Sequence, residues 1–285
     1  MSDLRIVFMG TPEFAVPSLE ILIENKFNVV AVITAPDKPQ GRGQKLVGSP
    51  VKECALKYQI PVLQPTNLKA PVFIEELKSY RANLQVVVAF RMLPESVWAM
   101  PAIGTFNLHA SLLPQYRGAA PINWAVINGE KETGVTTFFL KHEIDTGSII
   151  FQDTEPIGDK DTVGTLYERL MHKGAQLVLK TVNAINAGQY PSTPQTESAV
   201  IKHAPKIFKE TCVMNWNQPS EHLRNFVRGL NPYPGAWTVI NDKSYKIFEI
   251  RRLPGASDHS ETAGTLDSDN KTYQIGRASC RKECA

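Results

Sequence analysis

The most apolar run of the chain, Leu84–Phe90 (LQVVVAF), restricts the fold more than any other feature. An apolar run without alternating polar residues is typical of a strand covered on both faces, as in parallel sheets. Similar strand-like segments occur at Leu4–Gly10, Asn28–Thr34 and Ile103–Leu108, with helix-length segments between them. Strands that alternate with helices predict an α/β fold with a Rossmann-like, doubly wound and mostly parallel sheet.

The rest of the chain completes this domain and predicts a second, smaller one. Two further strands of the first domain, Thr133–Leu140 and Ser148–Asp153, precede a long amphipathic helix at Thr162–Ala187. A stretch rich in Pro and small polar residues follows, and then several short strands broken by turns, which is typical of a small OB-like β-barrel. We therefore expect a catalytic domain at 1–187, a linker at 188–205 and an OB-like domain at 206–285.

Composition indicates an ordinary globular protein, with 42% hydrophobic and 21% charged residues. No apolar run approaches the ~18 residues that cross a bilayer, and the start of the chain leaves no room for a signal peptide. The four cysteines lack the spacing of metal-binding or disulfide-rich domains. These features predict a cytoplasmic protein without a membrane partner, and we expect a monomer.

The positive charge of the chain is concentrated in two places. Basic and acidic residues balance over 1–204, so the net charge of +3 resides in 205–285. A second basic excess lies at Pro36–Lys52. It overlaps Thr34–Ser49, which has the Pro and Gly content of a long surface loop. Each patch alone is compatible with a solvated surface, whereas two patches flanking one site favour a polyanionic partner.

Candidate catalytic residues follow the predicted strands. In a parallel sheet, ligands bind at the carboxyl ends of the strands, where Phe90–Pro94 and Asn107–His109 are expected. Asn107 and His109 are two residues apart, so their side chains project to the same side. Asp145 lies in a later turn that can return a carboxylate to this edge. The first turn, Gly10-Thr11-Pro12, is not a GxGxxG motif, which argues against a dehydrogenase.

Together these motifs resemble the folate-dependent formyltransferase family, whose pattern is N-x-H-x-S-L-L-P followed by a distant Asp-x-Gly. The chain matches this pattern at Asn107–Pro114 (NLHASLLP) and Asp145–Gly147. Further segments are similar to the branch of the family that acts on methionyl initiator tRNA: Phe8–Ala15 (FMGTPEFA), Asp37–Gly43 (DKPQGRG), Gln115–Trp124 (QYRGAAPINW) and Arg228–Trp237 (RGLNPYPGAW). The resemblance extends over about residues 4–275.

The resemblance implies transfer of a formyl group from 10-formyltetrahydrofolate to the α-amine of methionyl initiator tRNA. Asn107 would donate a hydrogen bond to the oxyanion formed during attack, an interaction worth about 3 kcal/mol. His109 is suited to proton transfer near neutral pH. Asp145 either orients the His109 ring and favours its charged form, or collects the amine proton through an ordered water, and the sequence leaves both roles open. No metal is expected.

The resemblance also assigns binding residues. The folate is expected against Phe90, Arg91, Met92, Leu93, Ser111, Leu112, Leu113, Pro114, Ile144 and Gly147. Arg91 departs from the family pattern, which usually has Gly at that position. The tRNA is expected to contact Lys38, Arg42, Lys45 and Arg117, with lysines on phosphates supplying salt-dependent affinity.

Two alternative functions stay open at this stage. One is a formyltransferase acting on a small amine, such as glycinamide ribonucleotide or an amino-sugar nucleotide. The other is a non-catalytic tRNA-binding module. The last ten residues, Gly276–Ala285, resemble nothing that the family has at this position. We therefore expect a truncated or frameshifted end, which would leave the small barrel with an unpaired edge.

Overall fold

The computed structural model describes residues 4–40, 45–143, 145–195, 200–251, 266–268 and 273–275. The chain divides into two compact units. The first comprises Met1–Arg117, Thr133–Glu155 and Tyr167–Lys202, and the second comprises Gly118–Glu132, Pro156–Leu166 and His203–Ala285. Within the described ranges, none of the helices combines the length and the apolar character needed to cross a bilayer.

A seven-stranded sheet forms the centre of the first unit, with the strand order β10-β9-β7-β6-β1-β2-β5. These strands are β1 (Arg5–Gly10), β2 (Asn28–Ile33), β5 (Val62–Leu63), β6 (Leu84–Val88), β7 (Gly104–His109), β9 (Glu132–Phe139) and β10 (Ile149–Pro156). Pairing is parallel from β5 through β7, and β9 joins β7 in the antiparallel direction. The mostly parallel sheet predicted from the sequence is confirmed.

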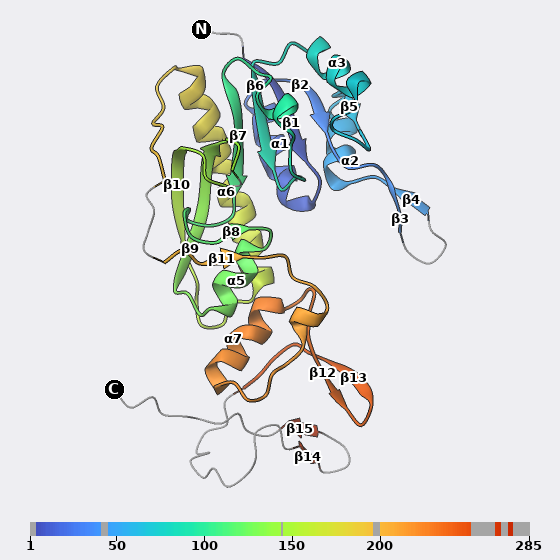
Figure 1. Ribbon diagram of the computed structural model, residues 1–285, viewed down its shortest axis with the longest axis vertical. Coiled ribbons are helices and arrows are strands. Elements are labelled where there is room, and N and C mark those ends of the chain that lie inside the picture. The colour runs from blue at the N-terminus through green and yellow to red at the C-terminus, as the bar shows by residue number, and fades with distance from the viewer. Residues whose placement is uncertain are drawn as a thin grey trace. The chain divides into compact units, whose positions relative to one another are not determined.

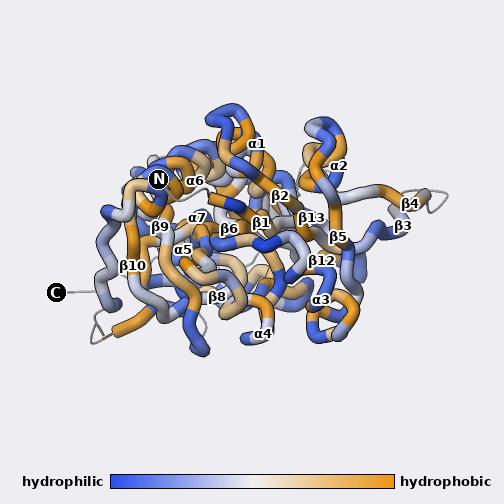
Figure 2. The backbone as a smooth tube through the Cα atoms, turned by 90° about the horizontal axis from the view of Figure 1, so that it is seen from above, coloured by the Kyte–Doolittle hydropathy of each residue, from blue (hydrophilic) through white to orange (hydrophobic). Residues whose placement is uncertain are grey.

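Helices cover both faces of this sheet. They are η1 (Glu13–Ala15), α1 (Val16–Glu24), α2 (Pro50–Lys57), α3 (Pro71–Ser79), α4 (Glu95–Trp98) and the long α6 (Val163–Asn186). Seen from above, α1, α2 and α6 lie on one side of the strands, and α3 and α4 lie on the other (Figures 1 and 2). All five residues of β6 are buried, because a strand between two helical layers has no solvent-facing side.

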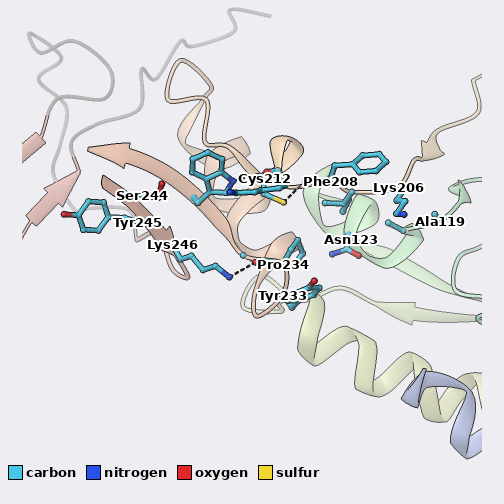
Figure 3. A pocket seen from close by; sticks show the side chains of 15 residues that line it. Ala119, Asn123, Lys206, Phe208, Cys212, Tyr233, Pro234, Ser244, Tyr245 and Lys246 are labelled. Carbon is cyan, nitrogen blue, oxygen red and sulfur yellow. Dashed lines mark hydrogen bonds between the residues drawn. The ribbon is translucent and has the colours of Figure 1, made fainter. Parts of the chain in front are cut away.

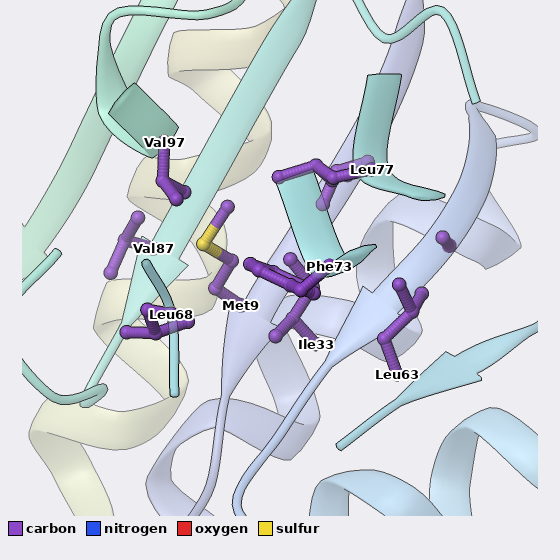
Figure 4. Packing of buried hydrophobic residues seen from close by; sticks show 10 residues of the cluster. Met9, Ile33, Leu63, Leu68, Phe73, Leu77, Val87 and Val97 are labelled. Atoms are coloured by element: carbon purple, nitrogen blue, oxygen red, sulfur yellow. The ribbon is translucent and has the colours of Figure 1, made fainter. Parts of the chain in front are cut away.

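Alternate residues of the central strands supply the two halves of the core. Val7 and Met9 of β1 pack with Ile33 of β2 against Phe73 and Leu77 of α3 (Figure 4). The intervening residues of β1 are also fully buried and project to the opposite face. Each large apolar side chain buried in this way contributes about 1.5–3 kcal/mol to the free energy of unfolding.

The basic segment Thr34–Ser49, predicted as a continuous loop, contains two short strands. β3 (Lys38–Gln40) and β4 (Lys45–Val47) pair in the antiparallel direction. The prediction of a long surface loop did not include this pairing. In the described part of the chain these strands pair only with each other, and their described side chains are exposed. They therefore leave no alternating pattern in the sequence.

A polar clamp closes the base of the β3–β4 hairpin. Lys52 Nζ lies 2.6 Å from Asp37 Oδ2, and Gln64 Nε2 donates to Asp37 Oδ1 at 2.7 Å. The hydrogen bonds from Gln64 and from Lys52 hold the pKa of Asp37 below its usual value. The carboxylate therefore joins the start of the hairpin to α2 and to the segment after β5.

The second unit contains α5 (Pro121–Ile127), β11 (His203–Ala204), η2 (Glu210–Cys212), α7 (Ser220–Leu230), β12 (Ala236–Ile240), β13 (Lys243–Ile247), β14 (Leu266–Ser268) and β15 (Tyr273–Ile275). A small apolar cluster links α7 to β12 through Leu223, Val227, Leu230 and Ala236. β12 pairs with β13, and β14 with β15, in antiparallel hairpins. Short strands were predicted in this region, and the closed OB-like barrel stays a prediction.

Candidate functional site

The carboxyl ends of three strands meet at one edge of the first unit's sheet. Gly10 of β1 is in register with Val88 of β6, and Val88 is in register with Leu108 of β7. From β1 the chain first adds β2 and β5 on one side and then returns to add β6 and β7 on the other. The strand order therefore reverses at β1, and such a reversal is where open α/β sheets bind ligands.

β7 carries the predicted pair, Asn107 and His109, at this edge. Leu108, between them, packs towards α6, where a Cβ on Gly174 would come within 2.7 Å of Leu108 Cδ2. Because side chains alternate along a strand, Asn107 and His109 project to the opposite face. His109 is buried and Asn107 is half-buried. The Asn107 side-chain amide makes no hydrogen bond to any residue in the described ranges, so its donors are open to a ligand.

His109 lies between a backbone carbonyl and a carboxylate. Its Nε2 is 2.8 Å from the carbonyl oxygen of Tyr116, and its Nδ1 is 3.9 Å from Asp145 Oδ2. A carbonyl oxygen only accepts, so Nε2 carries a proton in this arrangement. In the neutral ring the lone pair is then on Nδ1, which faces Asp145. The described ranges contain no group of three or more His, Cys, Asp or Glu side chains able to hold a metal ion.

Backbone constraints bring Asp145 to this position. Asp145 has a φ of 56°, in the left-handed region that Asp tolerates better than most residues. At Gly147 an added Cβ would lie 1.6 Å from the carbonyl oxygen of Phe139, so only glycine fits. Gln195 Nε2 donates to the carbonyl oxygens of Asp145, at 2.7 Å, and Gly147, at 2.9 Å. Ile144, predicted to contact folate, lies outside the described residues.

The Ser111–Pro114 segment is fixed by hydrogen bonds beneath it. Ser111 is fully buried, and its hydroxyl donates to the carbonyl oxygen of Gln115 at 2.6 Å. The hydroxyl of Thr136 on β9 donates to the carbonyl oxygen of Ser111 at 2.6 Å and accepts from the Leu113 N–H at 3.2 Å. The Ser111 hydroxyl is thus used inside the segment. Among the predicted folate contacts in this segment, Leu113 is buried, and Leu112 and Pro114 are half-buried.

The segment after β6 is tied to the sheet by apolar packing and by Arg91. Phe90 and Leu93 pack against the core cluster beneath α3, whereas Met92 is 74% exposed. The Arg91 guanidinium donates from Nη1 to the carbonyl oxygen of Thr66 at 3.1 Å and from Nη2 to that of Pro65. The residue that departs from the family pattern therefore anchors this segment to the one after β5.

The predicted tRNA contacts occupy different places. Lys38 is exposed on β3. Lys45 begins β4, but its side chain, like the whole of Arg42, lies outside what the structure describes. Arg117 donates from Nη2 to Gln195 Oε1 at 2.6 Å and from Nε at 3.2 Å.

Three contributors to this site were missed by sequence reasoning: the Tyr116 carbonyl, Thr136 and Gln195. A backbone carbonyl leaves no signal in residue type. Thr136 has the spacing of an ordinary strand residue, and Gln195 lies in a stretch that has the composition of a linker. Only the tertiary hydrogen bonds distinguish these residues from their neighbours.

The second unit contains a separate pocket of about 600 Å³ that combines aromatic rings with lysines (Figure 3). Its lining includes Phe208, Tyr233, Trp237, Lys206 and Lys246. Tyr233 is 80% exposed and Phe208 is 56% exposed. Lys246 Nζ donates to the carbonyl oxygen of Pro234 at 3.0 Å. Flat rings beside cationic groups are the elements with which proteins bind unpaired nucleotides.

Comparison with known proteins identifies the family. Residues 4–182 match the Formyl transferase family, and residues 206–281 match the family described as Formyl transferase, C-terminal domain. A methionyl-tRNA formyltransferase of Bacteroides fragilis is 57% identical over 279 residues, covering 95% of this chain and 86% of the relative.

Solved structures share the fold. The N-formyltransferase from Helicobacter canadensis, in complex with folinic acid and dTDP-3-aminofucose, matches with a TM-score of 0.68 and 22% identity, covering 96% of both chains. A variant of HypX from Aquifex aeolicus matches with a TM-score of 0.63 and 20% identity, covering 86% of this chain and 38% of HypX. At such identities the likeness concerns the fold alone. The sequence relationship is closer, and by it the chain belongs to the methionyl-tRNA formyltransferase family.

Proposed function

We propose that this enzyme transfers the formyl group of 10-formyltetrahydrofolate to the α-amino group of methionyl initiator tRNA, using Asn107, His109 and Asp145. The observation that carries the proposal is the His109 ring, held by the Tyr116 carbonyl with Nδ1 towards Asp145. The same strand presents the Asn107 amide, which has no hydrogen bond to the described part of the chain. The family relationship supplies the acceptor and the donor.

Asn107 is the oxyanion donor in this proposal. When the amine attacks the formyl carbon, the carbonyl oxygen gains negative charge. An amide donor that is already oriented, and has no competing partner among the residues that the structure describes, stabilises this charge more than it stabilises the neutral ground state. The half-buried position of Asn107 at the end of β7 strengthens that interaction, because the local dielectric is below that of water.

His109 and Asp145 handle the protons that the amine must lose. Nε2 of His109 is committed to the Tyr116 carbonyl, so Nδ1 is the ring atom that can accept a proton. Asp145 lies on the Nδ1 side and stabilises the positive ring that results. The ring charge is then dispersed between a carboxylate and a carbonyl oxygen. In the second assignment, Asp145 itself receives the proton through an ordered water.

The folate is assigned to the segments that surround this pair. The half-buried Phe90 and Leu93 follow β6, and Ser111–Pro114 follows β7, at the edge where these two paired strands end. The Asp145 carboxylate lies 3.9 Å from the His109 ring at the end of β7. Their backbone groups can read the donor and acceptor edge of a pterin, while their apolar side chains exclude water. The anchor provided by Arg91 keeps the first of these segments in place.

The tRNA is assigned to the β3–β4 hairpin and to the lysines and aromatic rings of the second unit. Lys38 on the hairpin and Lys206 and Lys246 of the pocket supply positive charge. Phosphate neutralisation by such residues gives affinity that falls steeply with salt. We further propose that the protein is a monomer and that it acts in the cytoplasm, where initiator tRNA is charged.

The test is a transfer assay with labelled 10-formyltetrahydrofolate and four acceptors offered in parallel. These are methionyl initiator tRNA, methionyl elongator tRNA, glycinamide ribonucleotide and an amino-sugar nucleotide. We expect formylation of the initiator tRNA only. Transfer to the small amines alone would refute the tRNA assignment, and binding of tRNA without any transfer would refute the enzyme assignment.

A further inference from the structure

The side chain of Gln195 uses all of its hydrogen-bonding groups within the active-site region. Nε2 donates to the carbonyl oxygens of Asp145, at 2.7 Å, and Gly147, at 2.9 Å. Oε1 accepts from Arg117 Nη2, at 2.6 Å, and Nε, at 3.2 Å. A glutamine amide offers two donor protons and two acceptor lone pairs, so each is satisfied here. This pattern also fixes the orientation of the amide, because the flipped form would place its NH₂ against a guanidinium.

These bonds join the two backbone segments that contact the His109 ring. Asp145 faces Nδ1 of the ring, and Tyr116, the residue before Arg117, holds Nε2. Gln195 is bonded to the first segment directly and to the second through the Arg117 side chain. One amide group therefore couples the positions of both partners of the ring.

The turn that Gln195 holds needs an external support. Asp145 has a φ of 56°, and a residue in such a conformation keeps it only where the surroundings over-determine it. Gly147 contributes no side chain. The guanidinium of Arg117 polarises the Gln195 amide and strengthens the two bonds that its Nε2 donates.

We infer that Gln195 is a positioning residue that sets the geometry of Asp145 relative to His109 during formyl transfer. This inference rests on the proposed function for the roles of Asp145 and His109. It does not assign contact between Gln195 and any substrate. The glutamine acts through the carbonyl oxygens of the turn, and the carboxylate follows the backbone.

The segment that carries Gln195 is also held by backbone hydrogen bonds that do not involve the Gln195 side chain. The positioning role of the amide can therefore be tested without detaching the segment. Two residues earlier, Thr193 exchanges backbone hydrogen bonds with Ile149 of β10, at 2.8 and 2.9 Å. That bridge keeps the segment beside the sheet when the Gln195 side chain is changed. Removal of the amide therefore loosens the turn without detaching the chain.

The experiment compares three variants of the full-length protein. Gln195→Met has a similar length and no amide. Gln195→Glu keeps an acceptor for Arg117 but places a carboxylate oxygen against the carbonyl oxygens of the turn. Gln189→Met makes the same chemical change at an exposed residue whose side chain has no hydrogen bond in the described ranges.

We expect both Gln195 variants to lower kcat for methionyl initiator tRNA by about 10- to 100-fold, because small misplacement of a reacting group has effects of this size. KM for the tRNA and the thermal midpoint should stay close to those of the parent protein. The ring ¹⁵N resonances of His109, read by NMR on histidine-labelled protein, should shift in Gln195→Met and stay unchanged in Gln189→Met.

Two results would overturn the inference. One is unchanged kcat and unchanged His109 resonances in Gln195→Met. The other is a loss in Gln195→Met that is accounted for by a lower thermal midpoint alone. If the parent protein fails to formylate methionyl initiator tRNA, the proposed function falls, and the His109 resonances still decide whether Gln195 sets the surroundings of the ring.

Discussion

The carbonyl oxygen of Tyr116 accepts a hydrogen bond from Nε2 of His109, across 2.8 Å. This contact fixes the neutral tautomer of the ring, since a carbonyl oxygen cannot donate. With the proton on Nε2, the free lone pair of the neutral ring is on Nδ1, the atom that faces Asp145.

Replacing His109 with glutamine tests this arrangement. The glutamine amide can still donate to the Tyr116 carbonyl, but it cannot take up a proton at the position of Nδ1. We expect kcat to fall by about 10²–10⁴-fold, the usual contribution of a general acid–base group. Folate affinity, measured by equilibrium fluorescence titration, should change little. A turnover within threefold of the parent would show that His109 carries no proton.

Asn107→Ala removes the proposed oxyanion donor. We expect kcat to fall by about 10²–10³-fold, as for other single oxyanion donors, while KM for both substrates stays nearly constant. Steady-state kinetics with each substrate varied in turn provides the measurement. A rise in KM at unchanged kcat would assign Asn107 to ground-state binding and contradict the oxyanion role.

Two threonines on β9 provide a matched pair for the stability of the site. The Thr136 hydroxyl serves Ser111 and Leu113, whereas the Thr133 hydroxyl is buried without a hydrogen-bond partner in the described ranges. We expect Thr136→Val to lower the free energy of unfolding by about 1–3 kcal/mol, because it orphans buried backbone groups. Thr133→Val should be neutral or stabilising. Urea unfolding of both variants checks the pair, and equal losses would contradict the assignment.

The clamp at Asp37 predicts a dependence of stability on pH. Hydrogen bonds from Gln64 and Lys52 lower the pKa of the folded state below that of the unfolded chain. The contribution of Asp37 to stability is therefore complete above about pH 4, the ordinary range of the carboxyl group, and is lost as pH falls through the lower folded value.

Asp37→Asn should consequently reduce the urea midpoint at pH 7, and the difference from the parent should shrink towards pH 3. Midpoints measured in steps of half a pH unit would trace this approach. A difference that stays constant over the whole range would show that the charge of Asp37 contributes nothing.

The sequence was sufficient to predict the main sheet because its strands are apolar on both faces. Leu84–Val88 and Arg5–Gly10 stand out from their surroundings for that reason. The pair Asn107 and His109 was also predictable, since two residues at the end of one strand share a direction whatever the details of the fold. The turn pattern allowed Asp145 to return to this edge, and the family resemblance singled it out.

The remaining features depend on contacts between distant residues. Gln195 is 78 residues from Arg117, and its stretch of sequence has neither periodicity nor charge that marks it. The β3–β4 hairpin escaped prediction because the side chains that the structure describes on its strands are exposed. In both cases the structure is determined by which groups form hydrogen bonds with each other. A single sequence does not specify those pairs.

Leu108 of β7 packs closely on Gly174 of α6, so the helix on one face of the sheet constrains the position of the residues on the other face. Asn107 and His109 are the immediate neighbours of Leu108 on one stiff strand. A larger residue at position 174 would push that strand outward, and both polar groups would move together by the same step. Their mutual spacing would survive, while their position relative to Asp145 would change. The packing of α6 on β7 thus sets the position of both proposed catalytic residues.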